Sequence, residues 1–240
     1  MKILIVGYGK MGRTIEKIAK ERGNEVPLIV DTNGQSFFDD IPEGAADVAI
    51  EFTQPEAAFD NIKACLERKI PVVSGTTGWL ERKPEVEEIA KANGSAFFYA
   101  SNYSIGVNLF FHLNKYLAKL MSGQQQYKVE MEEIHHTQKL DAPSGTAITL
   151  AEGIIENLES ATSWVLDEGG EVKKGEVPIV ALREPEVPGT HSIKFSSEVD
   201  EIEIKHTAHS RQGFAEGAVT AAEWLVGKKG VFGMEDMLRF

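Results

Sequence analysis

The sequence of 240 residues has little that would suit secretion, insertion into a membrane or binding to nucleic acid. It holds a single cysteine, Cys65, so no internal disulfide can form, which is consistent with a reducing compartment. No segment approaches the roughly 20 consecutive apolar residues of a membrane-spanning helix. Basic residues are few relative to acidic ones, and the net charge of −12 argues against a nucleic-acid-binding face and against an anionic membrane surface as partner.

The composition does allow a substantial core. Hydrophobic residues make up 42% of the chain, which is enough for one or two folded domains. Cys65 lies in an amphipathic run, and we expect it to be a small buried core residue. A predicted strand begins at the second residue with no signal peptide before it, so we expect a cytoplasmic protein.

A glycine-rich segment near the amino terminus predicts a dinucleotide site. Residues 2–6 (KILIV) predict a buried strand, residues 7–12 (GYGKMG) follow, and residues 13–22 have the apolar periodicity of a helix. A second strand is predicted at 25–30 and ends at Asp31. Such glycines permit a tight turn and close approach to a pyrophosphate at the helix start, and an acid about 20 residues on meets the ribose hydroxyls. A glycine-rich turn without a nucleotide is the weaker alternative, because every part of the pattern is present.

Strands and helices continue to alternate up to residue 104. We predict strands at 47–52, 71–74 and 96–100, helices at 55–69 and 85–93, and a loop over 33–46. This alternation predicts a parallel, doubly wound sheet with right-handed crossovers. Ligands bind such sheets at the carboxyl ends of their strands.

Three segments at these strand ends are candidates for further cofactor contacts: residues 51–53, 75–78 (GTTG) and 100–103. Each has a structural alternative, namely Phe52 in the core, GTTG as an ordinary turn, and Tyr103 packed at a domain edge. Phe52 or Tyr103 could instead flank a nicotinamide ring, and the three segments together favour the cofactor. The expected cofactor contacts are Gly7, Tyr8, Gly9, Lys10, Met11, Gly12, Asp31, Phe52, Gly75, Thr76, Thr77, Ala100, Ser101, Asn102 and Tyr103.

The pattern changes at Ile105. Residues 106–120 predict a longer helix, and its leucine stripe at helical spacing is expected in the core. The stripe consists of Leu109, Leu113, Leu117 and Leu120. Further strands are predicted at 127–134, 177–182, 190–195 and 201–208, with a helix at 147–158. The polar stretch 160–175 is compatible with a loop, a strand edge or a partly disordered segment.

A final helix at 214–226, followed by a short tail, is expected to pack back on the first domain. We therefore predict a dinucleotide-binding domain of residues 1–104 and 212–240, interrupted by a substrate-binding and oligomerisation domain of residues 105–211. The predicted fold class is α/β: a Rossmann-type doubly wound parallel sheet plus a second α+β domain with an open mixed sheet.

The densest group of reactive side chains is residues 135–146 (HHTQKLDAPSGT). The Pro-Ser-Gly-Thr turn leads into a predicted helix, whose first backbone N–H groups are unsatisfied and suit an anion. Lys139 adds a positive charge, and a histidine can donate or accept a proton near neutral pH. The segment predicts a site that binds a small carboxylate and moves protons. Taken alone, an exposed histidine pair and a solvated lysine would be the simpler interpretation.

These segments together resemble the 4-hydroxy-tetrahydrodipicolinate reductase family, formerly called dihydrodipicolinate reductases, of bacterial lysine and diaminopimelate synthesis. The most specific match is residues 133–146, with the pattern EIHH, Lys139 and DAPSGT. The glycine motif, the GTTG turn, residues 102–108 and the region from His206 to Ala218 match in order, so the resemblance covers nearly the whole chain. It implies NADH or NADPH as cofactor, hydride transfer to a cyclic imine dicarboxylate with loss of water, and a homotetramer whose second domains pair their sheets.

The resemblance gives roles to the residues of this segment. His135 is the expected general acid/base, since an unperturbed pKa of about 6.5 suits proton exchange, and Lys139 is a second proton donor or an electrostatic clamp. Both histidines can serve one site only if a loop begins at His135, because neighbouring residues of a strand face opposite sides. Asp141 either orients Lys139 or caps the turn, and capping is the expectation. The expected carboxylate contacts are His136, Ser144, Gly145 and Thr146.

Two features favour NADH over NADPH. Asp31 is followed by Thr-Asn-Gly without an arginine, and a carboxylate would repel a 2′-phosphate. Gln54 stands where relatives often have an arginine. Lys10 and Arg13 are near enough in sequence to offset this preference. The loop over 183–191 also departs from the family's pattern.

Other function classes explain less of the sequence. A different two-domain nicotinamide-dependent dehydrogenase, or a non-catalytic dinucleotide-binding redox sensor, would need the glycine motif but not the histidines and lysine beside an anion-binding turn. A serine hydrolase using Ser144 lacks the GxSxG elbow. No metal site is expected, because adjacent histidines do not supply three or four ligands and the lone cysteine is distant in sequence.

Overall fold

The computed structural model describes residues 1–32, 38–210 and 212–240. The chain divides into two compact units, one comprising Met1–Ile105 with Gln212–Phe240 and the other Gly106–Arg211. None of the helices in the described ranges is both long and apolar enough to cross a bilayer. Cys65 is fully buried in the first unit, as expected, and burial raises the pKa of its thiol.

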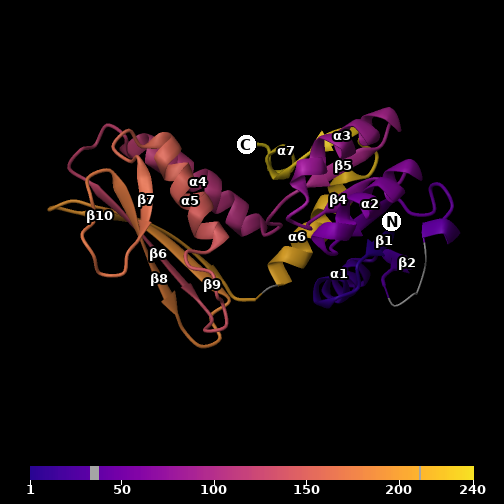
Figure 1. Cartoon of the computed structure of the whole chain (residues 1–240), viewed down its shortest axis with the longest axis horizontal. Coiled ribbons are helices and arrows are strands. Elements are labelled where there is room, and N and C mark those ends of the chain that lie inside the picture. The colour runs from indigo at the N-terminus through magenta and orange to yellow at the C-terminus, as the bar shows by residue number, and fades with distance from the viewer. Residues whose placement is uncertain (33–37, 211) are drawn as a thin grey trace. The chain divides into compact units, whose positions relative to one another are not determined.

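The first unit is built on a six-stranded parallel sheet in the order β11-β5-β4-β3-β1-β2. Its strands are β1 (Lys2–Val6), β2 (Glu25–Val30), β3 (Val48–Glu51), β4 (Val72–Ser74), β5 (Ala96–Tyr99) and β11 (Gly230–Phe232). Helices α1 (Lys10–Glu21) and α6 (Gln212–Leu225) cover one face, and α2 (Pro55–Glu67) and α3 (Lys83–Ala92) cover the other (Figure 1). The apolar run of β1 is buried on both faces, as a parallel sheet requires, so the predicted doubly wound sheet is confirmed.

The carboxyl-terminal tail contains more structure than the sequence predicts. After α6, β11 pairs with β5 at the sheet edge, and α7 (Met234–Leu238) follows. Elements of three and five residues are too short for hydrophobic periodicity to reveal.

Three elements nearer the amino terminus also differ from the prediction. Helix α1 begins at Lys10 rather than at the predicted Arg13, inside the glycine motif. In the predicted loop 33–46, Phe38–Asp40 forms a short 3-10 helix, and residues 33–37 lie outside the described ranges. A second short 3-10 helix, Leu80–Arg82, precedes α3.

The second unit has a mixed five-stranded sheet in the order β10-β9-β6-β8-β7. Its strands are β6 (Lys128–His135), β7 (Ser163–Leu166), β8 (Glu176–Arg183), β9 (Gly189–Ser196) and β10 (Glu201–Ala208). β9 is antiparallel to β6 and β10, whereas β8 is parallel to β6 and β7. Helices α4 (Ile105–Met121) and α5 (Gly145–Asn157) lie side by side over one face (Figure 1). The predicted mixed sheet is confirmed, and the stretch 160–175 supplies the edge strand β7.

Three of the four leucines in the α4 stripe are exposed, so the prediction that the stripe lies in the core was wrong for them; Leu117 is half-buried and packs against the core. Leu109 and Leu113 are 49% and 47% exposed, and Leu120 is 57% exposed. The buried side of the helix consists of Val107, Phe110, Asn114, Ala118 and Met121. The helix carries two neighbouring apolar rows, and periodicity identifies an amphipathic helix without deciding which of two adjacent rows meets the sheet.

Candidate functional site

The turn between β1 and α1 leaves open space at the helix start. Gly7 has φ +92°, and a Cβ there would lie 2.1 Å from the carbonyl oxygen of Phe52. A Cβ at Gly12 would lie 2.1 Å from the carbonyl oxygen of Gly7, so α1 can approach the turn this closely only with glycine. At Gly9, by contrast, a Cβ would meet none of the described residues within 4 Å apart from its own neighbours in the chain. The backbone at Gly9 therefore borders open space at the amino terminus of α1, which is the arrangement that accepts an anion.

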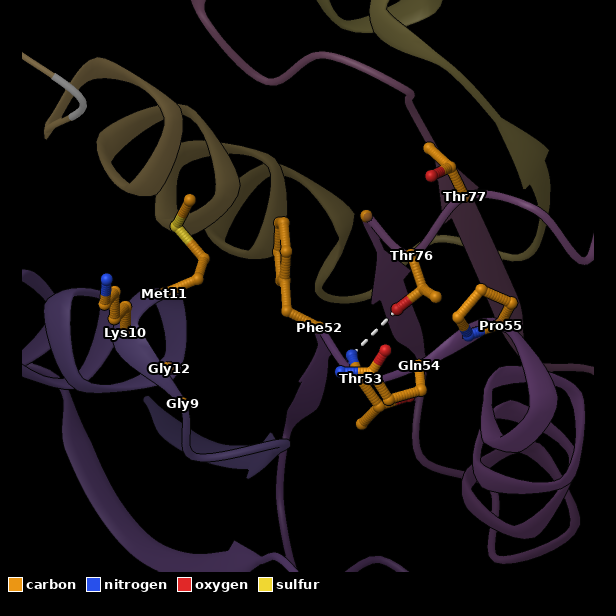
Figure 2. Close-up of a pocket in the computed structure, with 11 residues that line it drawn as sticks. Gly9, Lys10, Met11, Gly12, Phe52, Thr53, Gln54, Pro55, Thr76 and Thr77 are labelled. Carbon is orange, nitrogen blue, oxygen red and sulfur yellow. Dashed lines mark hydrogen bonds between the residues drawn. The ribbon is translucent and has the colours of Figure 1, made fainter. Parts of the chain in front are cut away.

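A pocket of about 360 Å³ adjoins this turn at the carboxyl ends of the strands. Figure 2 shows the Phe52 ring between Met11 on one side and Thr76 on the other. A Cβ at Gly75 would overlap the Phe52 ring, so this glycine lets the aromatic ring lie against the turn after β4. The lining residues are Gly9, Lys10, Met11, Gly12, Phe52, Thr53, Gln54, Pro55, Gly75, Thr76 and Thr77. Most of them are expected cofactor contacts, and the structure brings them together from three separate loops.

A buried glutamate joins two of these loops. Glu51, the last residue of β3, accepts hydrogen bonds from Ser74 Oγ at 2.6 Å, Thr76 Oγ1 at 2.7 Å and the Thr53 backbone N–H at 3.0 Å. Burial raises the pKa of the Glu51 carboxyl, and these hydrogen bonds oppose that rise. Glu51 was not predicted to have a role of its own, although an acid at the end of a buried strand is a usable signal. Its hydrogen bonds connect the ends of β3 and β4 and so fix the positions of Phe52 and Thr76, which follow these strands.

The predicted ribose contact lies next to the glycine turn. The backbone N–H of Tyr8 donates to Asp31 Oδ1 at 3.4 Å, which brings the acid beside the motif. The Arg13 guanidinium lies over the Tyr8 ring, 4.6 Å from its centroid. A carboxylate and a guanidinium are therefore both present near this turn, as the sequence analysis considered.

The segment after β5 is mostly packing. Tyr103 is 2% exposed, donates from its hydroxyl to the carbonyl oxygen of Ser74 at 2.7 Å, and packs its ring against Phe52 and Phe98. The Tyr103 ring thus packs against the Phe52 ring, which supports the interpretation of Tyr103 as a packing residue rather than a neighbour of the nicotinamide. Ala100 is buried, Asn102 is half-buried and Ser101 is exposed.

In the second unit, His135 is the last residue of β6 and the chain leaves the strand at His136, one residue later than predicted. The His135 side chain is buried, on the same side of the strand as Glu133 and Met131. The turn that follows is closed by a hydrogen bond from the Lys139 N–H to the His136 carbonyl oxygen at 3.0 Å. The strand end thus presents the two histidines and the lysine within one turn.

Glu133 lies at the centre of a buried group in the second unit. Its Oε2 is 3.3 Å from His135 Nδ1 and 3.6 Å from His191 Nε2, and its Oε1 accepts a hydrogen bond from the Ser144 N–H at 3.0 Å. Burial alone would raise the pKa of Glu133, but His191 and Ser144 hold it at about 2. Burial lowers the pKa of His135 to about 4, against the attraction of Glu133. At pH 7 the carboxylate is therefore ionised and the His135 imidazole is neutral.

These three residues also have the side-chain types of a metal site. One atom each from Glu133, His135 and His191 lies within 4.8 Å of the others. However, the Arg183 guanidinium lies 3.5 Å from the Glu133 carboxylate, and its positive charge would repel a metal ion bound there. Glu133 Oε1 already accepts from the Ser144 N–H, and His191 Nε2 lies 3.2 Å from Ser144 Oγ, so two of the three side chains have hydrogen-bond partners without an ion.

Lys139 is held by its own loop. Its Nζ donates to both carboxylate oxygens of Asp141, at 2.9 and 2.8 Å, and lowers the pKa of that acid. Of the two roles considered for Asp141, these bonds support orientation of Lys139. Arg183 at the end of β8 donates to the carbonyl oxygens of Lys139 and Asp141, at 3.3 and 2.6 Å, and so fixes the loop.

In the proposed anion-binding turn at the start of α5, Ser144 is buried and stabilises the turn, whereas Gly145 and Thr146 are accessible. Ser144 is 2% exposed, its Oγ accepts from the Ala147 N–H at 3.2 Å, and the same oxygen lies 3.2 Å from His191 Nε2. Its hydroxyl is thus a buried helix cap. Gly145 is exposed and Thr146 half-buried, at the first two positions of the helix.

Arg183 and His191 were not predicted to belong to this site. The sheet register places them: His135 pairs with Arg183 on β8, and Glu133 pairs with His191 on β9. Both residues occur in the loop segment 183–191, which differed from the family's pattern. A prediction would have required the register between strands, which a single sequence does not supply.

Comparisons with known proteins agree with this architecture. Two family models, described as the amino-terminal and carboxyl-terminal parts of dihydrodipicolinate reductase, match residues 1–103 and 106–238. A 4-hydroxy-tetrahydrodipicolinate reductase of Christiangramia forsetii is 52% identical over 238 residues, 99% of this chain and 98% of the relative. One from Desulfovibrio desulfuricans is 36% identical and covers 98% of each chain.

A solved structure shows the same fold. The dipicolinate-bound dihydrodipicolinate reductase of Paenisporosarcina sp. TG-14 superposes with a TM-score of 0.77 at 24% identity, over 99% of both chains. The family models together span nearly the whole chain, and the relatives match it from end to end. The chain therefore belongs to the dihydrodipicolinate reductase family of nicotinamide-dependent oxidoreductases.

Proposed function

We propose that this chain reduces 4-hydroxy-tetrahydrodipicolinate to tetrahydrodipicolinate with NADH or NADPH, as a cytoplasmic step of lysine and diaminopimelate synthesis. The observation that carries the proposal is the strand-end turn of the second unit, in which His135, Lys139 and the open start of α5 follow one another. A sensor would need the glycine turn of the first unit but not this second group.

The glycine turn fits a dinucleotide. A Cβ at Gly7 or Gly12 would strike backbone, whereas the space beside Gly9 is open at the start of a helix of 12 residues. Gly9 and Lys10 would hold the pyrophosphate, Asp31 the ribose hydroxyls, and Phe52 with Thr76 the nicotinamide end. When bound, the reduced cofactor supplies the hydride.

The substrate would be bound by charge and by backbone donors. Its two carboxylates would be held by the N–H groups of Gly145 and Thr146 at the start of α5 and by His136, with Lys139 supplying positive charge. His135 would exchange the proton. Its pKa of about 4 makes it neutral at pH 7, and two carboxylates bound nearby favour the charged imidazole and raise that pKa. Substrate binding itself would therefore prepare His135 to take up a proton.

The proposed homotetramer is supported by the face of the second sheet that lies opposite α4 and α5. Val177 and Ile179 of β8 are buried under the helices, so Pro178, Val180 and Leu182 point to the opposite face. Ile134 of β6 pairs with Leu182 and extends this apolar row. Helices α4 and α5 cover the other face, and an apolar row on a sheet face is the surface that pairing of second units would bury.

A coupled assay tests the proposed reaction. With 4-hydroxy-tetrahydrodipicolinate generated in situ, the purified chain is expected to oxidise NADH or NADPH at a rate proportional to enzyme concentration. Omitting the cyclic substrate should abolish oxidation, which controls for background. Tight cofactor binding without turnover of this substrate would instead support the non-catalytic sensor.

Cofactor preference gives a separate expectation. We predict a higher kcat/KM with NADH than with NADPH, because the Asp31 carboxylate repels a 2′-phosphate. Asp31→Asn should shift the ratio toward NADPH by about 5- to 10-fold, the equivalent of roughly 1 kcal/mol of repulsion. Asp60→Asn on the exposed face of α2 removes the same charge elsewhere and should leave the ratio unchanged. A much lower KM for NADPH in the unmodified chain would refute the preference.

A further inference from the structure

Two buried polar atoms face each other beside the proposed proton-exchanging residue. Glu133 Oε2 and His135 Nδ1 lie 3.3 Å apart, and neither forms a hydrogen bond with ideal geometry to any described residue. Buried polar atoms in folded proteins are almost always paired, so a small rotation of the ring is expected to complete this contact. The carboxylate can only accept, which requires the proton to be on Nδ1.

The rest of the Glu133 side chain is fixed. Its Oε1 accepts from the backbone N–H of Ser144 at 3.0 Å and lies 3.5 Å from Arg183 Nη2. Its Oε2 also lies 3.6 Å from His191 Nε2, and Glu133 itself is completely buried. The carboxylate therefore cannot turn away from His135 without breaking a contact to the first residue before α5.

The other nitrogen of His135 is kept clear. A Cβ at residue 189 would lie 3.1 Å from His135 Nε2, but the residue there is Gly189, at the start of β9. The absence of a side chain leaves room at Nε2, whereas Nδ1 faces the carboxylate. Because Nδ1 is buried and faces the carboxylate, Nε2 is the ring nitrogen that remains for a substrate.

We propose that Glu133 is a positioning residue that keeps the proton on Nδ1 of His135 and presents Nε2 for proton exchange with the substrate. Through its second oxygen, Glu133 also fixes Ser144, so the imidazole and the anion-binding turn of α5 keep a constant separation. The inference rests on the proposed role of His135 in the reductase reaction. It assigns to a buried glutamate the choice of histidine tautomer, a function that a hydrogen-bonded carboxylate commonly has beside a working imidazole.

Glu133→Gln is the informative substitution. The Ser144 N–H still needs a hydrogen-bond acceptor. The amide oxygen of the glutamine therefore takes the position of Glu133 Oε1, and its NH₂ group faces His135 Nδ1. The NH₂ group can only donate, so it favours the opposite tautomer, with the proton on Nε2. We expect kcat to fall on the order of 10- to 100-fold, part of the about 10²- to 10⁴-fold that a general acid or base contributes. Glu198→Gln, in the exposed turn between β9 and β10, removes the same charge and should leave kcat unchanged.

Two measurements separate positioning from a purely structural role. The ¹⁵N chemical shifts of His135 should show the Nδ1–H tautomer in the unmodified chain and the Nε2–H tautomer in Glu133→Gln, with NADH affinity unchanged. In a double-mutant cycle, Glu133→Gln should add no further loss of kcat to His135→Gln, since it acts through His135.

Four results would overturn the proposal. They are an Nε2–H tautomer in the unmodified chain, near-normal kcat in folded Glu133→Gln, losses that multiply in the double mutant, and stoichiometric zinc that is retained by the purified chain and lost in Glu133→Gln. Normal kcat in His135→Gln would overturn the proposed role of His135 instead, and the ¹⁵N spectra would then still test whether Glu133 sets the tautomer.

Discussion

Replacement of His135 by glutamine is expected to lower kcat by about 10²- to 10⁴-fold, the usual contribution of a general acid or base. Glutamine has a similar polar reach but does not exchange protons at neutral pH, so binding should be affected less than turnover. Because the cofactor pocket belongs to the first unit, the affinity for NADH should stay unchanged. Steady-state kinetics and cofactor titration measure both quantities.

Lys139→Ala is the companion variant. It removes the ammonium that Asp141 holds, so we expect both a lower kcat and a higher KM for the dicarboxylate substrate. Lys115→Ala, on the exposed side of α4, is the matched control for loss of a lysine that is paired with an acid. If both His135→Gln and Lys139→Ala folded normally and kept near-normal kcat, the assignment of these residues would be wrong.

The pH dependence of His135 follows from its burial. In the free chain its pKa is about 4, below the unfolded value of about 6.5. Between these values the unfolded state binds more protons, so His135 destabilises the fold as pH falls through this window. A bound dicarboxylate should raise the pKa of His135 toward neutrality. NMR titration of the imidazole with and without pyridine-2,6-dicarboxylate measures the shift, and an unchanged or lower pKa in the complex would contradict the proposed binding mode.

The second large effect is expected at the glycine turn. Gly9→Ala should raise the Kd for NADH by about tenfold or more, since the added methyl group enters space that a pyrophosphate needs. It should cost less than about 1 kcal/mol of stability, because its Cβ would clash with none of the residues in the described ranges and only the helix-cap preference changes. Gly123→Ala, in an exposed turn with equally open space, is the matched control.

Gly12→Ala should behave differently from Gly9→Ala. Its Cβ would lie 2.1 Å from the carbonyl oxygen of Gly7, so α1 must move and stability should fall by about 1–3 kcal/mol or more. Calorimetry distinguishes the two variants: Gly9→Ala loses binding with a normal Tm, whereas Gly12→Ala loses both. Normal NADH affinity in Gly9→Ala would show that the cofactor does not use this turn.

The sequence could predict the first sheet because its signals are local. The glycine motif, the buried run of β1 and the alternation of elements each lie within short windows, and a parallel sheet follows from them. Strand β11 was not predicted, because three residues are too few to show a hydrophobic pattern. Three leucines of α4, namely Leu109, Leu113 and Leu120, were assigned to the wrong environment because an adjacent apolar row, including Phe110, meets the sheet instead.

The site around His135 in the second unit was predictable only in part, because some of its residues are far apart in sequence. His135, Lys139 and the start of α5 are neighbours in sequence, so a single segment revealed them. Arg183 and His191 reach the same place from β8 and β9, through pairing that depends on strand register. The buried state of Ser144 also depends on tertiary packing, and the serine hydroxyl proved to be a helix cap.

The central claim is that the glycine turn and the basic strand-end turn serve one reaction. A crystal structure of the chain with NADH and pyridine-2,6-dicarboxylate tests it most directly. We expect the nicotinamide beside Phe52, one carboxylate on the N–H groups of Gly145 and Thr146, and His135 Nε2 facing the ring of the bound dicarboxylate. A complex in which both ligands are bound but His135 and Lys139 lie far from the dicarboxylate and the nicotinamide would contradict the account.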